Sequence, residues 1–171
     1  MIFTLDPLDG ALWGLPGQTL GWGLTIENDD SGWLVITSTT FDPTTSSIGD
    51  FSDFLTPQFF GYALPPNETW WQLFDADQSE GLGSYVIDGS FALPGDVATG
   101  NLNLLFDIHS IDPNAPGYDP VNDTVSGWQA LLPASVTYQT EAEVPEPASM
   151  ALSLAGLALC GLGLKAARRR P

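Results

Sequence analysis

The chain has 171 residues and carries 21 Asp and Glu but only 4 Lys and Arg, which gives it a formal net charge of −17. All of the Lys and Arg lie at or after Lys165, and all of the Asp and Glu lie at or before Glu146. Nucleic-acid binding is excluded for the acidic part, because phosphate contacts need cationic side chains. A basic clamp for phosphate or carboxylate substrates is excluded for the same reason.

Residues 1–140 have the pattern of an all-β domain, because Gly, Pro, Asn and Asp interrupt short apolar stretches and no stretch has a helical period. Thr19–Ile26 alternates, with its large apolar side chains on one face and Gly and Thr on the other. Trp33–Phe41 is rich in β-branched residues. A polar turn at 27–32 separates these two strands, which predicts a hairpin.

The middle of the chain predicts shorter strands. Phe51–Tyr62 contains several aromatic residues, but Pro57 indicates an edge or irregular segment. Trp70–Phe74 is expected to be a short aromatic strand. Ser84–Leu93 alternates as far as its end, with Tyr85, Ile87, Phe91 and Leu93 on one face.

Asn101–Ile111 is the clearest predicted strand, with four large apolar side chains facing inward and His109 among the polar ones facing outward. Asp112–Gly127 is rich in Pro and Gly and predicts a long loop. Trp128–Leu132 and Ser135–Gln139 are the last two expected strands. Short strands without crossover helices predict an antiparallel β-sandwich over residues 1–139, Ig-like or jelly-roll-like.

The C-terminal part of the sequence predicts a single transmembrane helix. Ala148–Leu164 is an uncharged run of 17 residues, and an extension to 148–167 is long enough to cross the hydrocarbon core. Pro147 is tolerated in a first helical turn and marks the expected start. The cations after the run resist translocation, so 168–171 should stay cytoplasmic and the acidic domain should lie outside. A buried helix of a soluble protein is the alternative, but the run offers little polar face.

The order of Pro-Glu-Pro, an apolar span and a terminal Arg cluster resembles the PEP-CTERM sorting signal of bacteria. The resemblance covers residues 144–171 and implies recognition by exosortase, an integral-membrane cysteine protease or transpeptidase, with removal of the signal near the Pro-Glu-Pro. It implies a recognition motif of Val144, Pro145, Glu146 and Pro147, and a stop-transfer element of Lys165, Arg168, Arg169 and Arg170. Residues 140–147 would be an acidic tether that ends in this motif. An ordinary tail anchor without processing is the alternative.

This resemblance implies a precursor in the inner membrane and a mature form at the outer surface or outside the cell. An exported protein should begin with a basic and then an apolar stretch, and Met1–Pro7 has neither. We therefore expect a signal peptide upstream of Met1.

No catalytic arrangement is visible in the sequence. His109 is the only His, Cys160 is the only Cys and lies in the apolar run, and no Gly-x-Ser-x-Gly elbow is present. Zinc sites need several such ligands. Paired carboxylates at glycosidase spacing would arise by chance among so many acids, so a glycan-active enzyme is the weakest alternative. We expect a protein that is not an enzyme.

Two binding hypotheses remain. Asp75, Asp77 and Glu80 place oxygen ligands at near-alternating positions, which suits calcium, although the spacing is not that of an EF-hand. Acidic residues that solvate a turn are the alternative. Trp70 and Trp71 could stack on sugar rings of an extracellular polysaccharide, although one of two adjacent strand residues normally faces the core. The expected function is therefore a sorted surface or matrix protein with a structural or ligand-binding ectodomain. The alternative is a carbohydrate- or calcium-binding module that keeps its membrane anchor.

Overall fold

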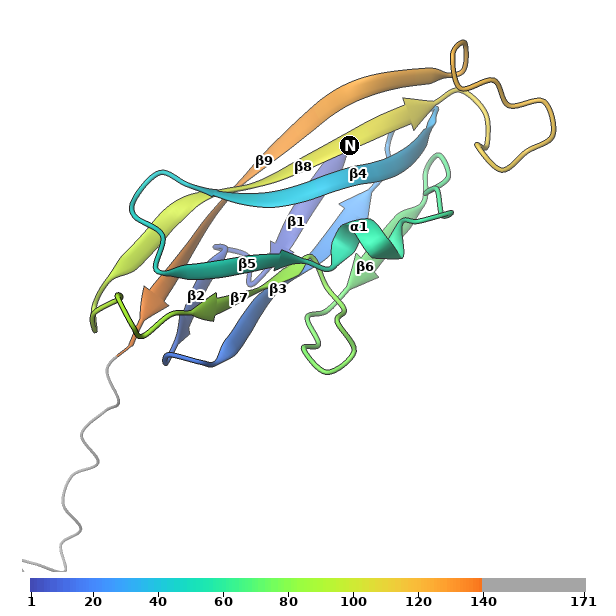
Figure 1. Cartoon of the computed structure of the whole chain (residues 1–171). Helices are drawn as coiled ribbons and strands as arrows, with labels where there is room; N and C mark the ends of the chain where they lie inside the picture. Colours follow the sequence, from blue (N-terminus) through green and yellow to red (C-terminus); the bar gives the residue numbers. More distant parts are fainter. Residues whose placement is uncertain (140–171) are drawn as a thin grey trace, which may run out of the picture. The chain divides into compact units, whose positions relative to one another are not determined.

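The computed structural model describes residues 1–139, which form two β-sheets packed face to face and one short helix (Figure 1). One sheet has five strands, in the order β1, β3, β7, β5, with β6 paired to β3. Its strands are β1 (Ile2–Asp6), β3 (Thr19–Glu27), β5 (Gly49–Asp53), β6 (Thr69–Gln72) and β7 (Gly83–Ile87). The other sheet has the order β2, β9, β8, β4 and consists of β2 (Ala11–Gly14), β4 (Trp33–Pro43), β8 (Val97–His109) and β9 (Thr124–Tyr138). Helix α1 (Leu55–Gln58) follows β5.

The all-β prediction for residues 1–139 is confirmed, but the sheets are not purely antiparallel. Strand β2 pairs with β9 in parallel, from Ala11 opposite Ser135 to Gly14 opposite Tyr138. Every other strand pair in the described part of the chain is antiparallel. The sequence does not reveal this pair, because side-chain alternation is the same in parallel and antiparallel strands.

The predicted hairpin of β3 and β4 is wrong, because the two strands belong to different sheets. Asn28, which follows β3, is fully buried, and its side-chain amide donates to the carbonyl oxygens of Gly32 (2.9 Å) and Leu64 (3.0 Å). Its Oδ1 accepts the amide proton of Asp30 at 3.2 Å. These bonds hold the polar turn in a conformation that leads the chain from one sheet to the other. A hairpin turn would instead place β4 beside β3.

His109, at the end of β8, is buried although the alternation places it among the outward-facing residues. The register of β8 with β4 runs without a shift from Phe106 to His109, so the alternation keeps its phase. The extra residue of the irregular β8–β9 pairing lies on β9, between Val125 and Trp128. His109 was expected to be solvated, and this expectation is wrong because only 6% of its surface is exposed. Its ring packs against Tyr118, with 5.5 Å between ring centroids.

Two predicted strand boundaries also differ from the structure. Strand β7 ends at Ile87, and Phe91 and Leu93 lie in the following loop with 57% and 66% of their surfaces exposed. The two expected last strands form one continuous strand, β9. Pro133 lies within it on the edge that has no paired strand, since β2 pairs only from Ser135 onward.

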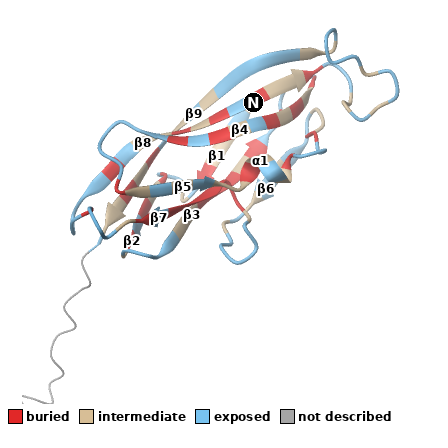
Figure 2. Ribbon diagram, in the orientation of Figure 1, coloured by how far each residue is buried: buried red, intermediate tan, exposed pale blue. Residues whose placement is uncertain are grey.

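The core lies between the two sheets. Figure 2 shows the buried residues along the strands that face one another. Trp22 on β3 is fully buried, with its ring centroid 5.8 Å from that of Phe41 on β4 and 6.4 Å from that of Tyr85 on β7. Its indole N–H donates to the carbonyl oxygen of Gly10 at 2.9 Å, so the buried polar atom is satisfied.

Within residues 1–139 no helix has the length and apolar character needed to cross a bilayer. The predicted span 148–167 and the cations after it lie outside the described residues, as do Val144, Pro145, Glu146 and Pro147.

Candidate functional site

The predicted sugar-stacking residues lie on opposite sides of β6. Trp70 is half-buried and packs edge-on against Phe59, with 5.3 Å between ring centroids. Trp71 points the other way and is 63% exposed. The structure therefore leaves Trp71 available to a ligand and uses Trp70 in packing, as expected for adjacent residues of a strand.

The three predicted calcium ligands lie in the loop between β6 and β7, where the carboxylates of Asp75 and Glu80 bond to protein groups. Asp75 Oδ1 accepts the amide protons of Asp77 (2.9 Å) and Gln78 (3.2 Å). Glu80 Oε2 accepts a hydrogen bond of 2.6 Å from the side-chain amide of Gln72. Within residues 1–139 no group of three or more His, Cys, Asp or Glu side chains is placed to hold a metal ion. The loop is thus closed by its own hydrogen bonds, and calcium binding stays a prediction.

His109 forms a compact network with two hydroxyl groups. Its Nδ1 lies 3.0 Å from Thr124 Oγ1 and 2.9 Å from the Tyr118 hydroxyl, and these two oxygens are 2.7 Å apart. Burial lowers the pKa of the imidazole, while the nearby Asp107 carboxylate raises it less strongly. This network joins the 110–123 loop to the start of β9, which is a structural arrangement and lacks the nucleophile–base–acid order of a hydrolase triad.

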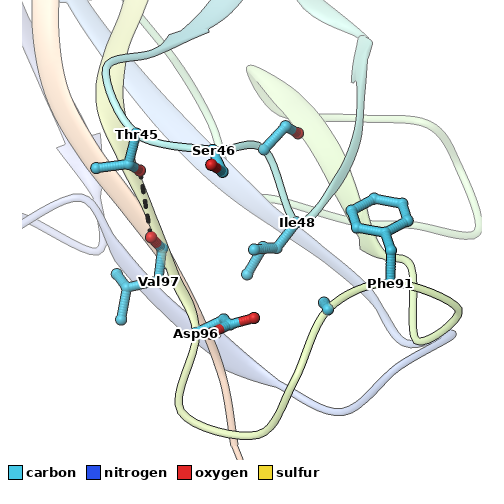
Figure 3. A pocket seen from close by; sticks show the side chains of 8 residues that line it. Thr45, Ser46, Ile48, Phe91, Asp96 and Val97 are labelled. Carbon is cyan, nitrogen blue, oxygen red and sulfur yellow. Dashed lines mark hydrogen bonds between the residues drawn. The ribbon is translucent and has the colours of Figure 1, made fainter.

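The clearest candidate site is a hollow between the loops 44–48 and 88–96 (Figure 3). Its volume is about 320 Å³, within the lower range of small-molecule sites. It is lined by Thr45, Ser46, Ser47, Ile48, Phe91, Ala92, Asp96 and Val97. These residues combine one aromatic ring, three hydroxyl groups and one carboxylate with an apolar floor.

The loop that leads from β4 to β5 is tied to β8 by backbone and hydroxyl contacts. Thr45 Oγ1 donates to the carbonyl oxygen of Val97 at 3.2 Å and accepts the amide proton of Thr99 at 2.9 Å. Ser47 Oγ donates to the carbonyl oxygen of Gly49 at 2.6 Å and lies 3.1 Å from the Tyr85 hydroxyl. The first wall of the hollow is therefore fixed before any ligand binds.

The loop that leads from β7 to β8 is held in a similar way. Asp88 Oδ1 accepts the amide proton of Ser90 at 2.8 Å, and hydrogen bonds from Ser90 hold the pKa of this carboxyl below its usual value. Asp96 Oδ2 accepts the amide proton of Leu93 at 2.8 Å. The Asp96 carbonyl accepts the amide proton of Tyr138, and the Tyr138 carbonyl accepts that of Gly95. Hydrogen bonds on both sides of Phe91 therefore hold the loop that carries this side chain.

The strand pattern of the sequence does not reveal this hollow, because alternation places Phe91 on one face of a strand with Tyr85 and Ile87. The available signal was the turn composition on either side, with Asp88-Gly89 before Phe91 and Pro94-Gly95-Asp96 after it. Those residues predict a loop, and a large aromatic side chain on a loop is exposed more often than one on a sandwich strand.

Comparison of the chain with family models, with curated proteins and with solved structures found no match.

Proposed function

We propose that this chain is an exported bacterial surface or extracellular-matrix protein that exosortase sorts and cleaves near Pro145–Pro147. The order of motif, uncharged run and Arg cluster in residues 144–171 carries the proposal, together with the complete separation of acidic from basic residues along the chain. The arrangement of the strands is compatible with such cleavage, because every strand of the two sheets lies between Ile2 and Tyr138. The precursor would sit in the inner membrane through the helix 148–167, in contact with lipid.

The ectodomain is proposed to be a β-sandwich of the Ig-like or jelly-roll-like kind with a binding or structural role and no catalytic one. Two observations support a role other than catalysis. His109 is the only His of the chain, and its Nδ1 is already engaged by the hydroxyl groups of Tyr118 and Thr124. The hollow beside Phe91 contains one carboxylate, whereas glycoside hydrolysis uses two.

A membrane-anchored binding module that keeps its C-terminal helix is the second candidate. The exposed ring of Trp71 and the hollow beside Phe91 favour binding of a polysaccharide, and this holds whether or not the anchor is removed. The two candidates differ in the mature C-terminus.

The deciding experiment is mass spectrometry of the mature protein. The full-length chain, with a signal peptide added before Met1, would be expressed in a bacterium that has an exosortase. We expect surface protein whose C-terminus lies near Pro147, and full-length protein in the membrane when Pro145, Glu146 and Pro147 are all replaced by Ala. Glu141→Ala together with Glu143→Ala is the matched control and should be processed normally. A peptide containing Leu164 in mature wild-type surface protein would refute processing.

A further inference from the structure

The hollow beside Phe91 contains polar groups that the protein leaves unused. Ser46 Oγ makes no hydrogen bond within residues 1–139, and Asp96 uses only Oδ2, so its Oδ1 is free of protein partners there. Figure 3 shows Ser46, Asp96 and Phe91 arranged around the same space, with Ile48 between them and Val97 beside Asp96. Polar groups that converge on an apolar floor are the usual signature of a small-molecule site.

A larger hollow beside α1 measures about 490 Å³ and has no buried floor. None of its lining residues is buried. In the hollow beside Phe91, by contrast, Ile48 and Ala92 are 4% and 5% exposed. Size alone therefore does not mark the better site, because a ligand buries apolar surface only where such a floor is present.

We propose that the hollow beside Phe91 binds one ring of a neutral sugar, with Phe91 as the platform and Asp96 and Ser46 as hydrogen-bond partners. This names the ligand class of the ectodomain and rests on the binding role proposed above. A volume of about 320 Å³ accommodates a single ring with its substituents rather than an extended oligosaccharide.

The chemistry of the three side chains matches a hydroxylated ring. An ionised carboxylate only accepts hydrogen bonds, and sugar hydroxyl groups donate to it strongly because the acceptor is charged. The Ser46 hydroxyl can donate to a ring or exocyclic oxygen and accept in return. Phe91 is 57% exposed, and the negative face of its ring attracts the slightly positive C–H groups on the apolar face of a sugar.

The charge of the hollow argues against anionic ligands, and its single aromatic ring argues against quaternary ammonium ions. Residues 1–139 contain no Lys or Arg, so an anionic ligand would meet the Asp96 carboxylate without any compensating side-chain cation. A quaternary ammonium ion would be attracted to Asp96, but such ions are held by cages of several aromatic rings, with Trp the most effective. Phe91 is the only aromatic residue that lines the hollow. A neutral polyhydroxylated ring is the class that remains.

The test is saturation-transfer NMR on the purified full-length chain in a detergent without a sugar headgroup. The probes are methyl β-glucopyranoside and methyl β-galactopyranoside as neutral sugars, glucuronate as an anion and tetramethylammonium as a cation. We expect transfer to at least one neutral glycoside and none to glucuronate or tetramethylammonium. Phe91→Ala should weaken binding at least about tenfold, and Asp96→Asn about tenfold, because each removes one main contact with the ring.

Leu93→Ala is the matched control, since Leu93 lies in the same loop, is 66% exposed and does not line the hollow. This variant should bind like wild type, and tryptophan fluorescence would verify that all variants fold. The proposal is overturned if neither neutral glycoside shows transfer, if Phe91→Ala and Asp96→Asn bind as well as Leu93→Ala, or if tetramethylammonium binds instead. None of these results would change the C-terminus measured by mass spectrometry, so the two proposals can fail separately.

Discussion

The two halves of β9 are both uncharged but have different surroundings. From Ser135 to Thr137 the strand is paired to β2 on one side and β8 on the other, and both Val136 and the preceding Ala134 are buried. From Thr124 to Leu132 it is paired only to β8, and Val125 and Trp128, opposite the core residues Ile108 and Phe106, are at least half exposed. The whole strand contains no charged residue.

This contrast shows that pairing and coverage by the second sheet decide burial here, rather than the apolar content of the strand. Trp128 lies opposite Phe106, which is only 5% exposed, yet Trp128 itself is 53% exposed. Two cross-strand neighbours on the same face thus differ because the opposite sheet covers β8 and does not cover this end of β9. The same substitution should therefore have different effects in the two halves.

The largest effect is expected for the leucines of this strand pair. Leu102 on β8 is fully buried, so Leu102→Ala should lower the free energy of unfolding by about 2–5 kcal/mol through lost burial and an unfilled cavity. Leu131→Ala, at a position that is 55% exposed and lies opposite Asn103 on the face away from the core, should change it by less than about 0.5 kcal/mol. Urea unfolding of the full-length chain measures both, and tryptophan fluorescence reports on the described part because all 6 Trp lie at or before Trp128. Equal losses would contradict the contrast.

A smaller effect is expected when a hydroxyl is placed at matched positions of β9. Val136→Thr should cost about 1–3 kcal/mol, because Val136 is fully buried and the new hydroxyl would lose water without a designed partner. Val125→Thr should cost less than about 0.5 kcal/mol, since Val125 is 60% exposed and the hydroxyl stays hydrated. The same unfolding assay applies, and a cost at Val125 that matches the cost at Val136 would show that the free half is covered in solution.

The smallest effect concerns the His109 network at the free end of β9. Burial lowers the pKa of His109 in the folded state, so below its ordinary value of 6.5 the unfolded chain binds more protons and stability falls. The stability that the neutral, buried imidazole provides is fully present above pH 6.5. It is lost as the pH falls through the lowered pKa of the folded state. His109→Gln should remove this pH dependence while retaining a partner for the hydroxyls of Tyr118 and Thr124.

The free energy of unfolding of wild type and of His109→Gln, measured between pH 7.5 and pH 5, would check this prediction. Carboxyl groups with lowered pKa values titrate separately, because their ordinary value is 3.8. Among them is Asp119, whose pKa is held down mainly by the amide of Val121. Wild type and His109→Gln with parallel pH profiles would show that the imidazole is not the responsible group.

The sequence predicts the strands well where alternation is long and uninterrupted. Thr19–Ile26 and Trp33–Phe41 lie within β3 and β4, because large apolar side chains at every second position must face a core. Their partners could not be predicted in the same way. Alternation identifies the buried face of a strand, whereas pairing depends on contacts such as those of the buried Asn28 side chain.

The candidate site was harder to predict than the strands. The hollow joins two loops that are distant in sequence, and Thr45 reaches Val97 only because β4 and β8 are neighbours. Of the two predicted stacking residues, Trp71 is exposed and Trp70 is packed, which sequence alone could not assign. The burial of His109 likewise depends on its contact with Tyr118, which strand alternation does not reveal.

The pairing of β9 also has a mechanical consequence. The last described strand is held by β8 along most of its length and by β2 at its end, and β2 runs parallel to it. A pull directed along β9 towards the C-terminus would load these rows of hydrogen bonds in shear, so that many must break together. A pull across the strand would instead open them one after another. The domain should therefore resist force best along the direction in which its chain leaves the sheet.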